Sequence, residues 1–402
     1  MPRETRIHRV AMRAPDDVEG LRALIDRGEV DPARLCAVMG KTEGNGCVND
    51  FSRALSLRAV GDALGAHAEG VAMVFSGGTE GGLSPHLLLF EVVGDHEPSD
   101  GGPQGGGARQ PAMAIGTAIT PDLSPEDIGT PAQIDSVARG VAEAMARAGI
   151  ERSEDVHFAQ VKCPLLTIER VAEAAARSRT TATTNTLKSM GISRGACSLG
   201  VGVALGEFSR EEAARALAEG DQSVFSSRAS ASAGIELMGN EIIVMGNSPA
   251  WRGRFAIEHG VMEDAIDTAA AAAATARLEA RGFAEVFTVL AKAEPSSSGL
   301  IRGRRHVMLG DSDISPTRHA RALVGGVLAG LFQRTDIYVS GGAEHQVRPL
   351  VTAAPIRCRA RRARRLSPLL AADSTTDAWW GSDPWNAAPI AARDPTAAGP
   401  SP

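Results

Sequence analysis

Three serine motifs along the chain share one frame. Ser76, Ser232 and Ser340 each begin a five-residue stretch that reads serine, a small residue, glycine, any residue and glutamate. A serine hydroxyl attacks a carbonyl carbon once a base removes its proton, and backbone N–H groups beside a small side chain can bind the developing oxyanion. One such motif is more often a tight turn. Three copies at comparable spacing favour nucleophilic chemistry.

A lysine precedes each serine motif and supplies a candidate base. Lys41, Lys162 and Lys292 each end a short apolar run of strand character, namely CAVMG, HFAQV and FTVLA. A neutral lysine amine can accept the serine proton, in a variant of the catalytic triad. Its pKa must then fall from about 10.4 towards about 7–8. Burial and neighbouring cations lower a lysine pKa in this way, so we expect three buried Ser–Lys pairs.

An arginine lies between each lysine and its serine. Arg53, Arg194 and Arg318 are each followed by seven residues, a glycine, three residues and a second glycine. A guanidinium group holds a carbonyl oxygen with paired N–H donors. Glycines four residues apart predict a helix with one smooth face for close packing. We further expect the glutamates of the serine motifs, Glu80, Glu236 and Glu344, to pair with these arginines.

Each repeat therefore reads as a strand ending in lysine, a helix carrying arginine and a strand ending in serine. This order predicts an α/β fold of three pseudo-threefold-related α/β repeat units. Three such sets around one axis would match a flat ring with three carbonyl groups. The predicted boundaries are 1–103 for repeat unit A, 104–110 for a Gly/Pro-rich linker, 111–250 for repeat unit B, 254–346 for repeat unit C, and 347–402 for a disordered tail.

Composition excludes several other classes of protein. The 402 residues are too many for one ordinary hydrophobic core. The net charge of -6 argues against a basic surface that binds nucleic acid. The charged N-terminal segment and the shortness of the apolar runs argue against secretion and membrane insertion. Five cysteines without CxxC spacing indicate free thiols in a cytoplasmic protein. No HxH or HExxH pair occurs, which argues against a zinc hydrolase.

The sequence resembles the cyanuric acid hydrolase/barbiturase family over about residues 8–347. The resemblance rests on VMGKTEGNGCVND (38–50), FSGGTEGGLSPH (75–86), VKCPLL, SRG, ASAGIE, RGRRH and VSGGAEHQ (339–346). It implies three similar domains around a central barrel-like sheet core. It also implies that the middle Ser–Lys pair, Ser232 with Lys162, is catalytic. The implied reaction is hydrolytic opening of a cyclic imide, either cyanuric acid to carboxybiuret or barbituric acid to ureidomalonic acid.

The same resemblance assigns residues around the substrate. The internal repeat selects Arg318 as the third arginine, whereas the distance to the serine expected from the family selects Arg321, so both are retained. The small cyclic imide is the expected partner, in a homotetramer without nucleic acid or membrane. The expected substrate-binding residues are Lys41, Arg53, Ser76, Gly77, Arg194, Ala233, Lys292, Arg318, Arg321, Ser340 and Gly341.

The family pattern includes a structural Mg²⁺ or Ca²⁺ ion but no cofactor for catalysis. Glu294, Ala343 and Gln346 match the ligands of that ion. After Gln346 the chain reads VRPLVTAAPIRCRARRARR, where the family continues with a Gly/Pro-rich loop and a final apolar strand. We therefore expect residues from about 347 onward to be partly disordered. An inactive ligand-binding paralogue is the alternative of another class, and an oligomeric metabolite-sensing scaffold is a third.

Overall fold

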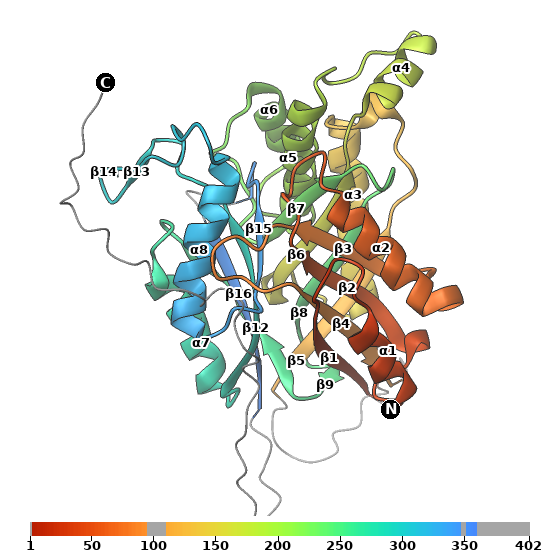
Figure 1. Cartoon of the computed structure of the whole chain (residues 1–402), viewed down its shortest axis with the longest axis vertical. Coiled ribbons are helices and arrows are strands. Elements are labelled where there is room, and N and C mark those ends of the chain that lie inside the picture. Colours follow the sequence, from red (N-terminus) through yellow and green to blue (C-terminus); the bar gives the residue numbers. More distant parts are fainter. Residues whose placement is uncertain (1, 95–109, 347–350, 360–402) are drawn as a thin grey trace, which may run out of the picture. The chain divides into compact units, whose positions relative to one another are not determined.

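The computed structural model describes residues 2–94, 110–346 and 351–359, which lie in a compact unit that spans Met1–Ala360. Its elements form a mixed α/β fold with three main sheets (Figure 1). The first sheet has the order β3-β2-β4-β1-β9. Its strands are β1 (Arg3–Ala11), β2 (Leu35–Thr42), β3 (Ala72–Gly77), β4 (His86–Val93) and β9 (Trp251–Arg252).

The second and third sheets repeat the pattern of the first. The second has the order β5-β8-β6-β7, and the third has the order β10-β16-β12-β15 with β11 also paired to β16. Their strands, with the small hairpin β13-β14, are β5 (Ala112–Ile119), β6 (Val156–Pro164), β7 (Ala229–Gly234), β8 (Glu241–Ser248), β10 (Phe255–Ile257), β11 (Gly260–Met262), β12 (Glu285–Ala293), β13 (Leu300–Ile301), β14 (Arg304–Arg305), β15 (Tyr338–Gly341) and β16 (Val351–Cys358).

In each main sheet the lysine-bearing strand lies between two partners. Strands β2, β6 and β12 pair in parallel with the serine strands β3, β7 and β15, and antiparallel with β4, β8 and β16. This shared order accords with the predicted repeat. The described strands form no closed sheet, so the pseudo-threefold relation of the units and the central barrel stay predictions.

Helices cover the outer faces of the sheets, and in Figure 1 α7 and α8 lie together beside the third sheet. One large apolar cluster collects side chains from all three sheets, including Val74, Val244 and Leu290. Both faces of the strands are therefore buried, which explains their nearly continuous apolar sequences. The helices are α1 (Glu19–Asp26), α2 (Phe51–Leu64), α3 (Pro131–Ala148), α4 (Ile168–Ala176), α5 (Thr186–Ala204), α6 (Arg210–Glu219), α7 (Thr268–Ala280) and α8 (Pro316–Phe332), with 3₁₀ turns at Pro32–Arg34, Gly65–Ala68, Pro125–Asp127 and Ser153–Asp155.

Five of the six paired glycines do not form the smooth packing faces predicted from their spacing, whereas a Cβ atom at Gly202 would collide with the Phe208 ring. A Cβ atom at Gly61, Gly326 or Gly330 would meet open space. Gly65 and Gly206 instead follow the ends of α2 and α5 with positive φ angles of 57° and 69°. Glycine adopts that backbone conformation without steric cost. The spacing therefore reflects helix termination in two repeats rather than close packing.

The third sheet also limits the expected disorder. β16 (Val351–Cys358) pairs with β10, β11 and β12 inside the segment 347–402, so the expectation of a disordered tail does not extend to these residues. The β-branched residues Val351, Thr352 and Ile356 favour a sheet strand. Residues 347–350 and 360–402 of the predicted tail lie outside the described residues, as does nearly all of the predicted linker at 104–110. The remaining repeat boundaries stay predictions.

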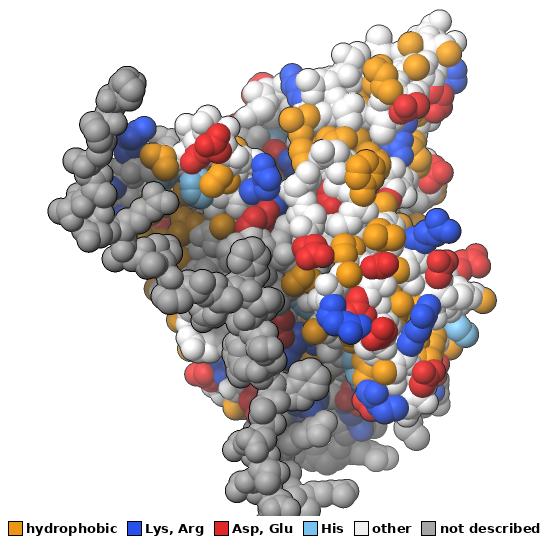
Figure 2. All heavy atoms as spheres, in the orientation of Figure 1, with side chains coloured by type: hydrophobic (Ala, Val, Ile, Leu, Met, Phe, Trp, Pro, Cys, Tyr) orange, Lys and Arg blue, Asp and Glu red, His pale blue; other side chains and the backbone are white. Residues whose placement is uncertain are grey.

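Charged side chains are spread over the visible surface. Figure 2 shows acidic and basic side chains mixed over the face in view, without a large patch of one sign. Among the described helices, none has the length and apolar character needed to cross a membrane.

Candidate active site

The strand register brings each predicted lysine beside its serine. Lys41 is the Cα partner of Ser76, Lys162 of Ser232, and Lys292 of Ser340. Directly opposite residues on parallel strands point to the same face of the sheet. The three lysines are buried, with exposed fractions of at most 1%. The three pairs inferred from sequence spacing are therefore neighbours in space.

The serines and three arginines line one small cavity. Arg53 comes from α2, Arg194 from α5 and Arg321 from α8. Arg318 does not line this cavity but lies in an adjoining hollow that Arg321 also lines. The lining residues are Gly46, Arg53, Ser76, Gly77, Met190, Arg194, Ser232, Ala233, Arg321, Ser340 and Gly341.

The first and third Ser–Lys pairs have direct hydrogen bonds. Lys41 Nζ donates to Ser76 Oγ at 3.4 Å and to the carbonyl of Gly77 at 3.1 Å. Lys292 Nζ donates to Ser340 Oγ at 3.3 Å and to the carbonyl of Gly341 at 3.0 Å. Both serine hydroxyls are thus held by their lysines.

The middle pair is different. Lys162 Nζ lies 2.7 Å from Glu236 Oε1 and donates to the carbonyl of Phe75 at 3.0 Å. Ser232 Oγ is buried and has no hydrogen-bond partner among the described residues. A buried hydroxyl without a partner is costly unless a ligand completes it. Ser232 is therefore the serine most available to a bound molecule.

Burial lowers the pKa of all three lysines, and a lysine that is to act as a base needs such a lowered pKa. The pKa of Lys292 falls to about 7, through burial first and then the nearby Arg194 cation. Burial lowers the pKa of Lys162, Glu236 opposes that shift, and Arg53 adds to it. Each lysine therefore loses its proton more readily than a lysine in water.

Two of the three motif glutamates pair with arginines, as predicted. Glu80 Oε2 accepts from Arg321 Nε at 3.0 Å, and Glu344 Oε2 accepts from Arg194 Nε at 2.8 Å. The glutamate and the arginine of each pair lie far apart in the sequence. A guanidinium held by two carboxylate oxygens has a fixed plane, so these glutamates orient two of the cavity arginines.

The same prediction is wrong for Glu236, which pairs with Lys162. Burial opposes its ionisation, yet the Lys162 and Arg53 cations lower the pKa of Glu236 to about 2. Arg53 instead donates to the carbonyls of Ala233 at 2.8 Å and Cys47 at 2.7 Å, with the Asp50 carboxylate 3.6 Å away. The middle set therefore places a carboxylate on its lysine, which neither of the other sets does.

Sequence reasoning missed Met190 and Gly46 in the cavity wall. Met190 lies in α5 among apolar neighbours and carried no signal that distinguishes it from a core residue. Gly46 has a φ of 71°, and a Cβ there would meet the Arg321 guanidinium and the carbonyl of Gly77. The glycine-rich stretch EGNG was its only sequence signal. Cys163 is buried in the apolar core.

The residues matched to a structural divalent ion do not present a preformed set of ligands. Glu294 accepts hydrogen bonds from Thr317 Oγ1 at 3.0 Å and the amide of Gly342 at 2.6 Å. Gln346 Oε1 accepts from the amide of Ala231, and the Ala343 carbonyl accepts from the amide of Gln346. These oxygens face hydrogen-bond donors, but each keeps a second lone pair that a hard cation could use, so the ion site stays a prediction.

Comparison with known proteins gives a consistent set of relatives. The sequence matches the family described as amidohydrolase ring-opening protein over residues 6–351. It is 54% identical over 345 residues to a cyanuric acid amidohydrolase of Azorhizobium caulinodans, covering 85% of this chain and 94% of that relative. A cyanuric acid amidohydrolase of Bradyrhizobium sp. is 51% identical over 362 residues, with coverage of 86% and 95%. The crystal structure of a cyanuric acid hydrolase from A. caulinodans has a TM-score of 0.81 at 51% identity, covering 89% of this chain and 100% of that chain.

Proposed function

Because this chain belongs to the ring-opening amidohydrolase family, we propose that it opens cyanuric acid to carboxybiuret with Ser232 as nucleophile and Lys162 as base. The chain is a hydrolase that acts on carbon–nitrogen bonds in cyclic amides. The observation that carries the mechanism is the unpartnered Ser232 hydroxyl at a cavity where three arginines meet.

The choice of substrate follows from the composition of the cavity wall. Three serines and three arginines surround the space, drawn from the three sheets that share one strand order. We infer from that order a pseudo-threefold arrangement. Cyanuric acid has three equivalent carbonyl and N–H groups, whereas barbituric acid replaces one N–H with CH₂. Three retained sets of polar groups therefore favour cyanuric acid.

In the proposed reaction Lys162 leaves its contact with Phe75 and takes the proton from Ser232 Oγ. The neighbouring Glu236 carboxylate, 2.7 Å from Nζ, stabilises the ammonium that forms. Ser232 Oγ bonds to a ring carbonyl carbon, and the cavity arginines stabilise the negative charge on its oxygen. The ring C–N bond then breaks, the nitrogen takes the proton from Lys162, and water hydrolyses the acyl-enzyme.

The other two Ser–Lys pairs would hold the remaining carbonyl groups of the ring. Their serines already accept hydrogen bonds from Lys41 and Lys292, so they are positioned to donate their own protons to carbonyl oxygens. Arg321 rather than Arg318 would complete the set, because only Arg321 lines the cavity. We also propose, on the family resemblance, a homotetramer in the cytoplasm.

The test follows ring opening of cyanuric and barbituric acid in parallel by ultraviolet absorbance. Loss of the cyanuric acid signal alone would support the proposal, and loss of the barbituric acid signal alone would replace it with barbiturase activity. Loss of neither, together with ligand binding measured by calorimetry, would favour the inactive ligand-binding paralogue.

A further inference from the structure

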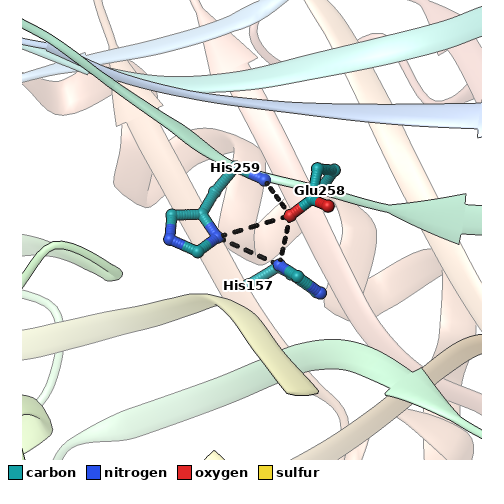
Figure 3. Close-up of side chains that lie close together, drawn as sticks. All are labelled: His157, Glu258 and His259. Carbon is teal, nitrogen blue, oxygen red and sulfur yellow. Dashed lines mark hydrogen bonds and ion pairs between the residues drawn. The ribbon is translucent and has the colours of Figure 1, made fainter. Parts of the chain in front are cut away.

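A second cluster of polar side chains lies apart from the cavity residues and is drawn in Figure 3. His157 comes from the start of β6, while Glu258 and His259 form the turn between β10 and β11. We propose that these three side chains bind a divalent transition-metal ion of the Zn²⁺ class. His157 Nδ1 lies 3.0 Å from His259 Nδ1 and 2.9 Å from Glu258 Oε1, and His259 Nδ1 lies 3.8 Å from that oxygen.

Hydrogen bonding alone leaves this cluster poorly satisfied. Two ring nitrogens and a carboxylate oxygen point at one another, as the dashed lines in Figure 3 show. A neutral imidazole carries one N–H, so two facing Nδ1 atoms either share one proton or bring two protons into contact. A cation at the centre would satisfy all three lone pairs at once.

The spacing of the three atoms suits a metal ion. Bonds of about 2.0–2.2 Å at tetrahedral angles place ligand atoms about 3.3–3.6 Å apart. The observed separations of 2.9, 3.0 and 3.8 Å bracket that range. Small side-chain rotations would therefore bring the atoms to bonding distance, with a fourth position left for water.

Neighbouring groups hold the ligands as an outer shell does in metal sites. Arg277 on α7 donates from Nε to the other Glu258 oxygen, Oε2, at 3.0 Å, and from a terminal nitrogen to the His259 carbonyl at 2.7 Å. Glu258 Oε1 faces the two histidine rings and also accepts a hydrogen bond from the His259 amide at 3.1 Å, which leaves it a further lone pair for an ion. Such contacts to the second carboxylate oxygen fix the orientation of a monodentate ligand.

The ligand set selects the class of ion. Two imidazoles with one carboxylate suit Zn²⁺, Co²⁺, Ni²⁺ or Cu²⁺, whereas Mg²⁺ and Ca²⁺ prefer oxygen ligands. The side chains of His157 and His259 are 12% and 23% exposed, which leaves a path for an ion to enter. The site would clamp β6, the strand of Lys162, to the β10–β11 turn. It is distinct from the oxygen-ligand site that the family pattern places near Glu294.

The test uses full-length protein without an affinity tag, stripped with a chelator and kept in excess Mg²⁺. Equilibrium dialysis should show one bound equivalent of Zn²⁺ or Co²⁺. Bound Co²⁺ should give visible bands of nitrogen and oxygen coordination, and either ion should raise the melting temperature. His157→Gln and His259→Gln should each weaken binding by more than about 100-fold, since outer-shell changes alone cost about 10–100-fold. His67→Gln, an exposed histidine in a 3₁₀ turn, should bind like the unaltered protein.

Three results would overturn the proposal. These are no bound Zn²⁺ or Co²⁺, equal binding by all three variants, or a sulfur-to-cobalt charge-transfer band that assigns the ion to cysteine. If a histidine variant fails to fold, Glu258→Gln provides the same comparison with a neutral side chain of equal size. Ring opening is measured on the same samples. Because the cluster contributes no residue to the cavity wall, loss of metal with retained activity separates this site from the proposed catalytic one.

Discussion

Lys162 Nζ lies 2.7 Å from Glu236 Oε1, whereas the matching glutamates of the other two motifs bind arginines. This ion pair distinguishes the middle Ser–Lys pair from its two counterparts. It leaves Ser232 Oγ without a hydrogen-bond partner among the described residues, and it places a counter-ion where an ammonium would form during proton transfer. The asymmetry supports the proposed assignment of roles within three otherwise similar sets.

Replacing the proposed nucleophile should abolish turnover but not binding. Ser232→Ala is expected to lower kcat by at least about 10⁴-fold, because no other group is proposed to form the acyl-enzyme. Ligand affinity, measured by calorimetry, should change little. Ser230→Ala is the matched control: Ser230 lies on the same strand and is fully buried, but it does not line the cavity. Retained turnover in the Ser232 variant would refute the assignment.

The pH dependence of activity should reveal the charge of Glu236. Its carboxylate raises the pKa of Lys162 against the larger effect of burial. Glu236→Gln removes that charge, so the lysine loses its proton at lower pH. Because the proposed base acts only when neutral, the acidic limb of the kcat/KM profile should shift to lower pH. Glu80 pairs with Arg321 rather than with a lysine, so the control variant Glu80→Gln should leave that limb in place. Coincident limbs for Glu236→Gln and the unaltered enzyme would contradict Lys162 as the base.

A pair of arginine variants should decide which residue binds substrate. Arg321→Lys keeps the charge but loses the paired donors at the cavity, so KM should rise by about 10–100-fold, as expected for lost hydrogen bonds to a charged group. Arg318→Lys should change KM by less than about threefold, because Arg318 lies in the adjoining hollow. Steady-state kinetics of both variants provides the comparison, and the reverse ranking would restore the assignment based on the internal repeat.

Glu241 should make the protein less stable above neutral pH. It begins β8 and accepts a hydrogen bond from the amide of Met73 at 2.7 Å, and burial raises its pKa to about 7. The unfolded chain ionises this group near pH 4.5, so the free energy of unfolding falls between pH 4.5 and 7. Glu241→Gln should recover up to about 3 kcal/mol at pH 8 and almost nothing at pH 4. Denaturant unfolding at both pH values checks this, with exposed Glu151→Gln as control; an equal effect at both pH values would contradict it.

Two truncations should separate β16 from the rest of the C-terminal segment. Removing residues 361–402 leaves the compact unit whole, so the melting temperature and ring-opening activity should be retained. Removing residues 347–402 deletes β16, which pairs with the Lys292 strand β12, and should prevent stable folding. Thermal unfolding and activity of the two shortened proteins test this. A stable, active protein ending at residue 346 would show that β16 is dispensable.

The sequence by itself determined the local parts of the site. Each lysine and each serine ends an apolar strand, and those strands pair in parallel, so the repeated spacing was enough to predict the three pairs Lys41–Ser76, Lys162–Ser232 and Lys292–Ser340. These features depend on short stretches of chain, whose periodicity is visible in the residues themselves.

Only the tertiary structure decided the contacts between the three sheets. It placed Arg321 rather than Arg318 at the cavity, paired Glu236 with Lys162, and added β16 to the third sheet. It also brought His157 to Glu258 and His259, and no short histidine motif in the sequence indicates this cluster. The physical reason is that these contacts form between segments many tens of positions or more apart in the chain. Such long-range contacts leave no period in the sequence.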